Sequence, residues 1–393
     1  MSNWSTVQFS DIADFKNGLN FKSGETGHAL KVLGVGDFQN RTFLDQVDEI
    51  STVHTEKEIN SSYHLQDGDL VFVRSNGNKA LVGRCMLVRD AKEKISFSGF
   101  TIRARLTTSD ILPAFVNLLM QAGVLRKELK RDGRGTNISN LNQDMLSKIE
   151  IPLISIDQQR EILDFFSNWN KAIEKTEALI DAKERQFGWL VTRLINKSGH
   201  KKKQLSDFIS EVSVRNRGNE IDRVLSVTNH SGFVLPEDQF ERRVASANVS
   251  NYKIVQQGQY AYNPSRINVG SIARLDDWDN GILSPMYTVF KLDQKIAHSD
   301  YFLHWLSSSE AKQRIKKSAQ GSVRATVSFG DLGAIPICLP ELSVQQNIAN
   351  TLNTAQQEVT LLKKLADQYR TQKRGLMQKL LSGEWHIKNK EAA

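Results

Sequence analysis

The sequence has very little cysteine and no long apolar segment. Its two cysteines, Cys85 and Cys338, lie far apart, and none of its eight histidines falls at a metalloenzyme spacing such as His-Glu-x-x-His. These absences argue against a disulfide framework and a structural zinc site. No window approaches the roughly 18 uninterrupted apolar residues of a membrane span, and Met1–Phe15 lacks the basic and apolar regions of a signal peptide. The sequence therefore predicts a soluble protein of the cytoplasm without a metal site.

The charged residues carry a positive excess. With 52 Lys and Arg against 44 Asp and Glu, the formal net charge is +8. A positive excess favours a polyanionic partner, although it also occurs on ordinary solvated surfaces. The positions of the cations along the chain must therefore distinguish a polyanionic partner from an ordinary solvated surface.

The segment Asp157–Asn196 has no proline and repeats its apolar residues at the spacing of a helix with one apolar face. Steps of three and four residues connect Ile162, Phe166, Trp169, Ile173, Ile180, Phe187, Leu190 and Leu194, with Thr176 and Lys183 as polar interruptions. This spacing predicts one long helix that packs as a coiled coil.

The same spacing returns near the C-terminus, and each position lies 186 residues after its counterpart, as Ile348 does after Ile162. The second set comprises Ile348, Leu352, Ala355, Val359, Leu362, Ala366, Tyr369, Lys373, Leu376 and Leu380. A solitary helix would expose this apolar face to water. We therefore expect the two long helices to pack together as an antiparallel coiled-coil stalk.

The duplication extends beyond the helices. The segment Leu65–Gly68 corresponds to Val255–Gly258, and Val82-Gly83 corresponds to Val269-Gly270. The chain is thus two copies of one unit. We predict an α+β fold divided into a first globular domain at 1–150, a helical spacer at 151–199, a second globular domain at 200–335, a distal helical spacer at 336–385, and a tail at 386–393.

Within each globular domain, short β-branched and aromatic runs predict strands. In the first domain we expect strands at Asp69–Arg74, Ala80–Val88 and Ser96–Leu106, and a helix at Pro113–Leu129. In the second domain we expect strands at Gln259–Tyr262 and Val269–Leu275, and a helix at Ser299–Ser318. The first two strands of each set form a hairpin with a polar tip.

Cations gather at matching places in the two copies, each time next to a glycine loop with hydroxyl side chains. Lys and Arg neutralise phosphates, while Arg and Asn at hairpin tips read base edges. The first candidate DNA site comprises Arg74, Ser75, Asn76, Asn78, Lys79, Arg126, Lys130, Arg131, Arg134, Thr136 and Asn137. The second comprises Asn263, Ser265, Arg266, Asn268, Lys312, Lys316, Lys317, Ser322 and Arg324. One such cluster alone favours a solvated helix face, but two clusters at matching repeat positions favour contact with nucleic acid. The tip residues are also ordinary turn formers.

Catalytic motifs are weak. The phosphate-binding pattern G-x-x-x-x-G-K-[ST] is absent, and Tyr262-Asn263-Pro264-Ser265 lacks the second proline and the aromatic residue of an amino-methyltransferase. A metal-dependent nuclease would rest on Asp110 with Glu128 and Lys130, a spacing common by chance. Two alternatives to DNA recognition stay open: a coiled-coil protein scaffold with incidental basic faces, and this nuclease.

Taken together, these features resemble the DNA-specificity subunit of type I restriction-modification enzymes. The likeness covers residues 5–385. It rests on Ile151-Pro152 followed by Asp157-Gln158-Gln159, on Leu339-Pro340 followed by Val344-Gln345-Gln346, and on the glycine loops ahead of each.

The resemblance implies a non-catalytic subunit with two target-recognition domains, each of which binds one half of a split double-stranded DNA target. It also implies two methyltransferase subunits docked on the helices, and restriction and translocase subunits in a larger complex. S-adenosylmethionine, ATP and magnesium would belong to those partners. Gln158, Gln159, Gln345 and Gln346 would mark the starts of the two helices.

Overall fold

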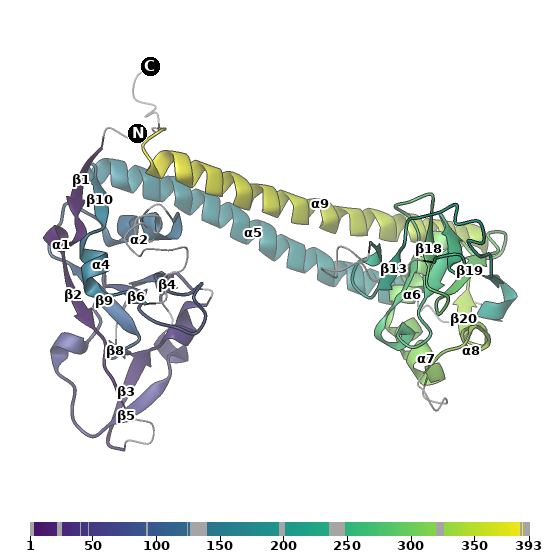
Figure 1. The fold of residues 1–393 in the computed structure, drawn as a ribbon, viewed down its shortest axis with the longest axis horizontal. Coiled ribbons are helices and arrows are strands. Elements are labelled where there is room, and N and C mark those ends of the chain that lie inside the picture. Colours follow the sequence, from purple (N-terminus) through teal and green to yellow (C-terminus); the bar gives the residue numbers. More distant parts are fainter. Residues whose placement is uncertain are drawn as a thin grey trace. The chain divides into compact units, whose positions relative to one another are not determined.

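The structure is a computed structural model, and it divides into two compact units. It describes residues 4–21, 26–39, 41–45, 47–91, 93–123, 125, 140–195, 201–235, 248–319, 326–385 and 387. The first unit is Met1–Lys175 with Leu365–Ala393, and the second is Thr176–Lys364. The boundary crosses both long helices, so each unit combines one globular part with parts of both helices (Figure 1).

The first unit is built on a five-stranded sheet with strand order β2-β9-β6-β7-β4 and a three-stranded sheet with order β5-β3-β8. A separate pair, β1 and β10, leads into the long helix α5. Its strands are β1 (Ser5–Gln8), β2 (Ala13–Asn17), β3 (His28–Leu33), β4 (Phe43–Leu44), β5 (Thr52–Thr55), β6 (Leu70–Val73), β7 (Cys85–Val88), β8 (Ile95–Phe97), β9 (Thr101–Leu106) and β10 (Glu150–Leu153). Its helices are α1 (Phe9–Ile12), α2 (Pro113–Gln121), α4 (Gln143–Ser147) and the start of α5 (Ile156–Ile195).

The second unit repeats this plan with a four-stranded sheet of order β12-β19-β16-β17 and the pairs β13–β14, β15–β18 and β11–β20. Its strands are β11 (Lys201–Gln204), β12 (Ile209–Val212), β13 (Ser226–Thr228), β14 (Gly232–Val234), β15 (Lys253–Gln256), β16 (Tyr260–Tyr262), β17 (Ile272–Arg274), β18 (Asn280–Leu283), β19 (Thr288–Leu292) and β20 (Pro336–Leu339). Its helices are the 3-10 turns η4 (Leu205–Asp207) and η6 (Ile267–Val269), α6 (Ser299–Ser307), α7 (Ser309–Ala319), α8 (Phe329–Gly333) and the start of α9 (Leu342–Leu381).

Two glycines confirm the predicted tandem repeat. Gly68 and Gly258 both have a positive φ, +88° and +79°, a conformation that favours glycine. Each donates its backbone N–H across the sheet, Gly68 to the Val88 carbonyl (3.0 Å) and Gly258 to the Leu275 carbonyl (2.8 Å). The same turn therefore precedes β6 and β16, as the predicted correspondence of these segments requires.

Several predicted elements are shorter than expected or are divided. The strand predicted at Val269–Leu275 is only β17, because Val269 lies in the 3-10 turn η6. Of the helix predicted at Pro113–Leu129, α2 ends at Gln121, ahead of Gly123 with its positive φ of +71°.

The strand predicted at Ala80–Val88 begins only at Cys85, because Gly83 takes a positive φ of +77° in the preceding turn. The strand predicted at Ser96–Leu106 is two strands, β8 and β9, separated by a turn at 98–100. The helix predicted at Ser299–Ser318 breaks at Ser308, whose backbone is extended (ψ 154°) and whose side chain accepts a hydrogen bond from the Ala311 N–H.

The long helices α5 and α9 pack side by side and antiparallel within each unit. In the first unit, Ile162 and Phe166 share a core cluster with Leu380 and Leu381, and Trp169 meets Tyr369 edge to face at 5.9 Å. In the second unit, the end of α5 packs on the start of α9 in one cluster that includes Val191, Ile195, Ala349 and Leu352. The predicted antiparallel pairing of the two helices is confirmed.

The polar interruptions of the two apolar faces have partners across the helix pair. Lys183 forms an ion pair with Glu358 (2.8 Å), and Lys363 forms one with Glu184 (2.6 Å). In the first unit, Lys373 donates a hydrogen bond to Asn170. Lys183 and Lys373 thus keep polar partners at the helix contact, whereas the pair of Lys363 with Glu184 is largely exposed and stabilises the helices little.

One glutamine at the start of each long helix is fully buried, at 0 % exposure. The Gln345 side-chain oxygen accepts a hydrogen bond from the His298 N–H, while its NH2 group donates to the Ile296 and Pro340 carbonyls (2.8–3.0 Å). Gln159 accepts from the Leu112 N–H and donates to the Asp110 and Ile154 carbonyls in the same way. The neighbouring Gln158 and Gln346 are exposed. The equivalent residues of the two predicted glutamine pairs are therefore Gln159 and Gln345.

In the described part of the chain, no helix is both long and apolar enough to span a membrane.

Candidate nucleic-acid interface

In each unit, the hairpin loop is joined to the segment that follows the predicted glycine loop, and the two joints are at equivalent positions. The Leu141 N–H, directly after the first glycine loop in the sequence, donates to the Arg74 carbonyl at the end of β6 (2.8 Å). The Val327 N–H, after the second glycine loop, donates to the Pro264 carbonyl after β16 (3.0 Å). Each pair of segments is more than 60 residues apart in the chain. In both units, the hairpin loop at the carboxyl end of β6 or β16 thus lies next to the segment that follows the glycine loop.

Some predicted DNA-binding residues lie outside the described residues. These are Arg126, Lys130, Arg131, Arg134, Thr136, Asn137, Ser322 and Arg324.

In the first hairpin loop, the two asparagines shape the turn. The Asn76 side-chain oxygen accepts a hydrogen bond from the Asn78 N–H (2.7 Å), and the Asn78 oxygen accepts from the Ala80 N–H (3.1 Å). Bidentate recognition of adenine needs both the oxygen and the NH2 group of an asparagine side chain. Each oxygen already accepts one hydrogen bond within the loop, so these side chains have lost part of their accepting capacity, while their NH2 groups take no part in these two hydrogen bonds. Lys79 is exposed, while Arg74 is half-buried and donates weakly to the Gly99 carbonyl (3.5 Å).

In the second hairpin loop, the predicted residues divide into buried and exposed ones. Asn263 is buried, and its side-chain oxygen accepts a hydrogen bond from the Ser265 N–H, so it supports the turn. Ser265, Arg266 and Asn268 are exposed. The loop closes at Gly270, whose φ is +96°. Ser265, Arg266 and Asn268 are therefore the predicted side chains of this loop that are placed to reach a ligand.

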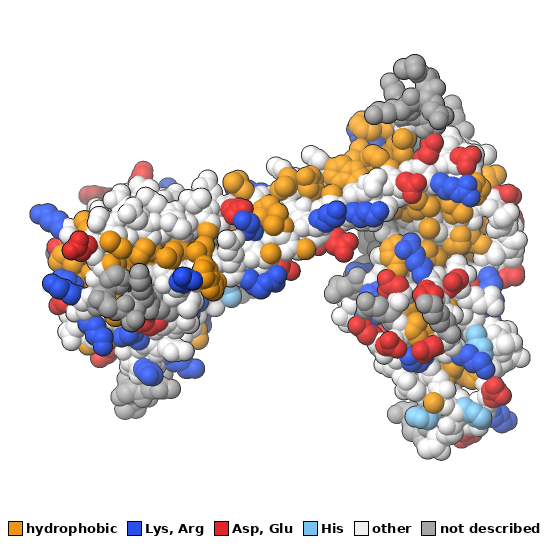
Figure 2. Space-filling view, turned by 180° about the vertical axis from the view of Figure 1, so that it is seen from behind, with side chains coloured by type: hydrophobic (Ala, Val, Ile, Leu, Met, Phe, Trp, Pro, Cys, Tyr) orange, Lys and Arg blue, Asp and Glu red, His pale blue; other side chains and the backbone are white. Residues whose placement is uncertain are grey.

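Helix α7 carries the cations of the second unit next to this loop. Its apolar residues Ala311 and Ile315 are buried in the same core cluster as Ile267 of η6, which fixes the helix beside the loop. Its exposed cations are Lys312, Lys316 and Lys317. Arg314 differs, since it pairs with Glu310 and donates to the Pro336 carbonyl. Figure 2 shows several Lys and Arg side chains over the lower part of this unit, on the left of that view.

A partly buried polar network ties the globular part of the second unit to α9. Arg274 of β17 pairs with Asp300 of α6 (2.6 Å), and Asn353 of α9 donates to the other Asp300 oxygen (2.8 Å). Burial by itself would raise the pKa of Asp300, but the hydrogen bonds from Arg274 and Asn353 hold this pKa below its ordinary value. His304 shares a hydrogen bond with the Asn353 oxygen (2.7 Å), and burial lowers its pKa. A neutral His304 thus helps to fix α6 on α9.

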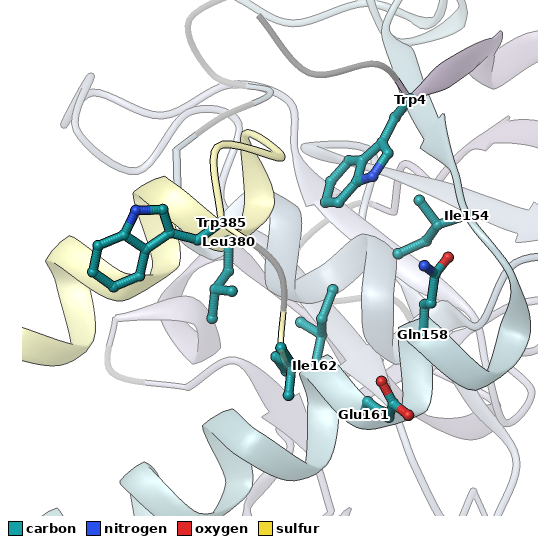
Figure 3. A pocket seen from close by; sticks show the side chains of 8 residues that line it. Trp4, Ile154, Gln158, Glu161, Ile162, Leu380 and Trp385 are labelled. Atoms are coloured by element: carbon teal, nitrogen blue, oxygen red, sulfur yellow. The ribbon is translucent and has the colours of Figure 1, made fainter. Parts of the chain in front are cut away.

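An apolar pocket in the first unit lies where α5 begins and α9 ends (Figure 3). It is lined by Trp4, Ile154, Gln158, Glu161, Ile162, Leu380, Trp385 and Ile387. Its one charged side chain is a carboxylate. This lining disfavours a polyanion, so we do not assign the pocket to the DNA interface.

Among the described residues, no group of three or more His, Cys, Asp or Glu side chains could hold a metal ion. The nuclease alternative relied on Asp110, Glu128 and Lys130. The last two lie outside the described residues, and the Asp110 carboxylate accepts a hydrogen bond from the Thr108 hydroxyl.

The tandem α+β units, with matched loops at the carboxyl ends of β6 and β16 and a long helix after each, are typical of a two-domain binding protein. The protein family described as "Type I restriction modification DNA specificity domain" matches residues 1–182 and 245–368. The chain belongs to this family.

Named relatives agree with this assignment. The chain is 22% identical to the putative type I restriction enzyme MjaX specificity subunit of Methanocaldococcus jannaschii, over 98% of this chain and 94% of that subunit. It is 27% identical to the type I restriction enzyme EcoKI specificity subunit of Escherichia coli K12, over 48% of this chain but only 39% of that subunit. In fold it is similar to the crystal structure of the type I restriction-modification S subunit from M. genitalium, with a TM-score of 0.53, 15% identity and 96% coverage of both chains.

These matches confirm the predicted family and, with it, the predicted role as a non-catalytic DNA-specificity subunit of a type I restriction-modification system. The alternatives of a protein scaffold and a nuclease are not favoured.

Proposed function

We propose that this chain binds a bipartite double-stranded DNA target, with one half-site for each globular domain, and that α5 and α9 dock two methyltransferase subunits. Restriction and translocase subunits would complete the complex in the cytoplasm. S-adenosylmethionine, ATP and magnesium would be bound by those partners. The domains would extend over 1–150 and 200–335, and the helical spacers over 151–199 and 336–385.

The observation that carries this proposal is the matched but different pair of loops. Both hairpin loops leave equivalent strands and meet the segment after a glycine loop through equivalent backbone hydrogen bonds. Their side chains differ, since Arg74-Ser75-Asn76 in the first unit corresponds to Pro264-Ser265-Arg266 in the second. Contacts to the DNA phosphates position a protein on the duplex, whereas side-chain contacts to the base edges determine which sequence is bound. Two loops with the same backbone arrangement but different side chains therefore suit two half-sites of different sequence.

Two exposed leucines support the docking of partners on the helices. Leu179 of α5 and Leu361 of α9 are 44% and 56% exposed within the second unit. The ion pair between Lys183 and Glu358 places them at the same level of the helix pair, because each leucine lies about one turn from one of its partners. Large apolar side chains in water favour a protein contact.

The test of this proposal is the pattern of methylated bases in host DNA with the gene for this chain intact and deleted. We expect a methylated motif of two short, different blocks separated by a gap of fixed length, and we expect it to vanish on deletion. A methylated motif that persists after deletion, or one without a gap, would contradict the proposal.

Replacing Arg266 by alanine should relax base preference in one half-site only. If Arg266 contacts a guanine through two hydrogen bonds, the loss of discrimination at that base should be about 1–3 kcal/mol. Arg74→Ala should act in the same way on the other half-site. The measurement is competitive binding of the assembled complex to duplexes that vary at one base.

The matched control for Arg266 is Lys316→Gln on the neighbouring α7. Because a phosphate contact carries no base information, this variant should weaken binding to all sequences alike and reduce the salt dependence of binding. Should Arg266→Ala behave like this control, Arg266 would be a phosphate contact.

A further inference from the structure

Each unit exposes one large apolar side chain at the same position of its sheet. Phe100, in the turn between β8 and β9, is 63% exposed, and Met286, in the turn between β18 and β19, is 59% exposed. Leu70 pairs with Ala104, and the equivalent Tyr260 pairs with Phe290. Ala104 and Phe290 thus correspond, and Phe100 and Met286 each lie four residues earlier.

Both residues lie directly beside the hairpin loops of the candidate interface, Phe100 through its backbone and Met286 through its side chain. The Phe100 carbonyl accepts a hydrogen bond from the Arg74 N–H (2.8 Å). In the second unit, the Met286 sulfur lies 4.0 Å from the Asn263 side-chain nitrogen. The two residues are therefore part of the same surface as the predicted base contacts.

The backbone around Phe100 is fixed. The Gly99 N–H donates to the Leu19 carbonyl (2.7 Å), and the Thr101 hydroxyl donates to the Ser98 carbonyl (2.7 Å). A Cβ atom at Gly99 would lie 2.0 Å from the Asn20 side-chain oxygen, so the turn is packed against its neighbours. Around Met286, the Tyr287 N–H donates to the Ser284 carbonyl (3.0 Å), and Tyr287 is 9% exposed. Each of these exposed apolar side chains is thus carried by a turn whose backbone is fixed by hydrogen bonds.

A single exposed apolar residue on a protein surface is ordinary. Two at equivalent positions, each next to a loop that carries an arginine, favour a ligand that is polyanionic and also has apolar parts. Duplex DNA is such a ligand, because apolar side chains contact the thymine methyl group in the major groove or insert at a base step.

We propose that Phe100 and Met286 are the apolar base contacts of this protein, one in each half-site. This inference rests on the proposed function. A phenyl ring and a thioether differ in width and flexibility, so the two contacts contribute to the difference between the half-sites.

The test uses the full chain assembled with its methyltransferase subunits, carrying Phe100→Ala or Met286→Ala. Binding is measured against duplexes randomised in one half-site at a time. We expect each variant to lose about ten-fold of the discrimination at one base position in one half-site, and the two variants to act on different half-sites. Each variant is thereby the matched control for the other. Phe100→Leu, which stays apolar, should retain part of the discrimination and covers the case in which the alanine variant fails to fold.

Two DNA probes then identify the apolar feature. Uracil in place of thymine removes only the methyl group. If this replacement weakens DNA binding by the wild type but not by Phe100→Ala, Phe100 contacts the thymine methyl group. A rise in 2-aminopurine fluorescence at the affected step, lost in the variant, assigns insertion between bases. A response to neither probe, an equal loss on all sequences, or no loss would overturn the inference. A wild-type complex without sequence preference in either half-site would instead count against the proposed function.

Discussion

Replacing Gln345 by leucine should lower the free energy of unfolding of the second unit by about 3 kcal/mol or more. The side chain is fully buried and satisfies three backbone groups, the His298 N–H and the Ile296 and Pro340 carbonyls. Leucine fills a similar volume but leaves all three groups without their partner, and each unsatisfied buried group costs about 1–3 kcal/mol. Hydrogen-deuterium exchange of peptides from the second unit measures this loss separately from the first unit.

The neighbouring residue supplies the control. Gln346 is exposed, so Gln346→Leu should change stability by no more than about 0.5 kcal/mol. Equal effects of the two substitutions would contradict the assignment of Gln345 as the buried partner. Gln345→Glu should also destabilise strongly, because an ionised carboxylate accepts the His298 N–H but cannot donate to two carbonyls.

The long helices could be predicted from the sequence because their apolar spacing is regular and is repeated 186 residues later, as Ile162 and Ile348 show. The two short breaks could not. Ser308 ends a helix by capping the next one, and the turn at 98–100 depends on contacts with Leu19 and Asn20. Both features come from local side-chain bonds or distant packing, which periodicity does not record.

The candidate interface was predictable in its residue types but not in its geometry. Hairpin tips rich in Arg and Asn suggested base contacts, yet the buried position of Asn263 follows from its hydrogen bond to Ser265. Phe100 was missed because Ser96–Leu106 was expected to be one strand, which hides a turn residue among alternating core positions. One sequence signal indicates this turn. Ser-Gly dipeptides favour turns, and Ser98-Gly99 is such a dipeptide.

Lengthening both long helices by four residues should change the preferred gap between the two half-sites. The insertions belong after Thr176 in α5 and after Lys364 in α9, since the antiparallel register of the ion pair between Lys183 and Glu358 places these two points at one level. Four helical residues add about 6 Å, which corresponds to about two base pairs at about 3.4 Å each. A binding selection with duplexes of graded gap length measures the preference.

The control is the insertion in α5 alone. Four residues at about 3.6 per turn rotate the apolar face by roughly 40° and shift it along α9, so core residues such as Ile180 would lose their contacts. This variant should lower the stability of the helix pair, whereas the paired insertion keeps the same residues in contact on either side. If the paired insertion folds and binds with an unchanged gap, the helices do not set the spacing between half-sites. A longer preferred gap would mean that helix length and gap length are coupled, because the base contacts themselves are untouched by the insertion.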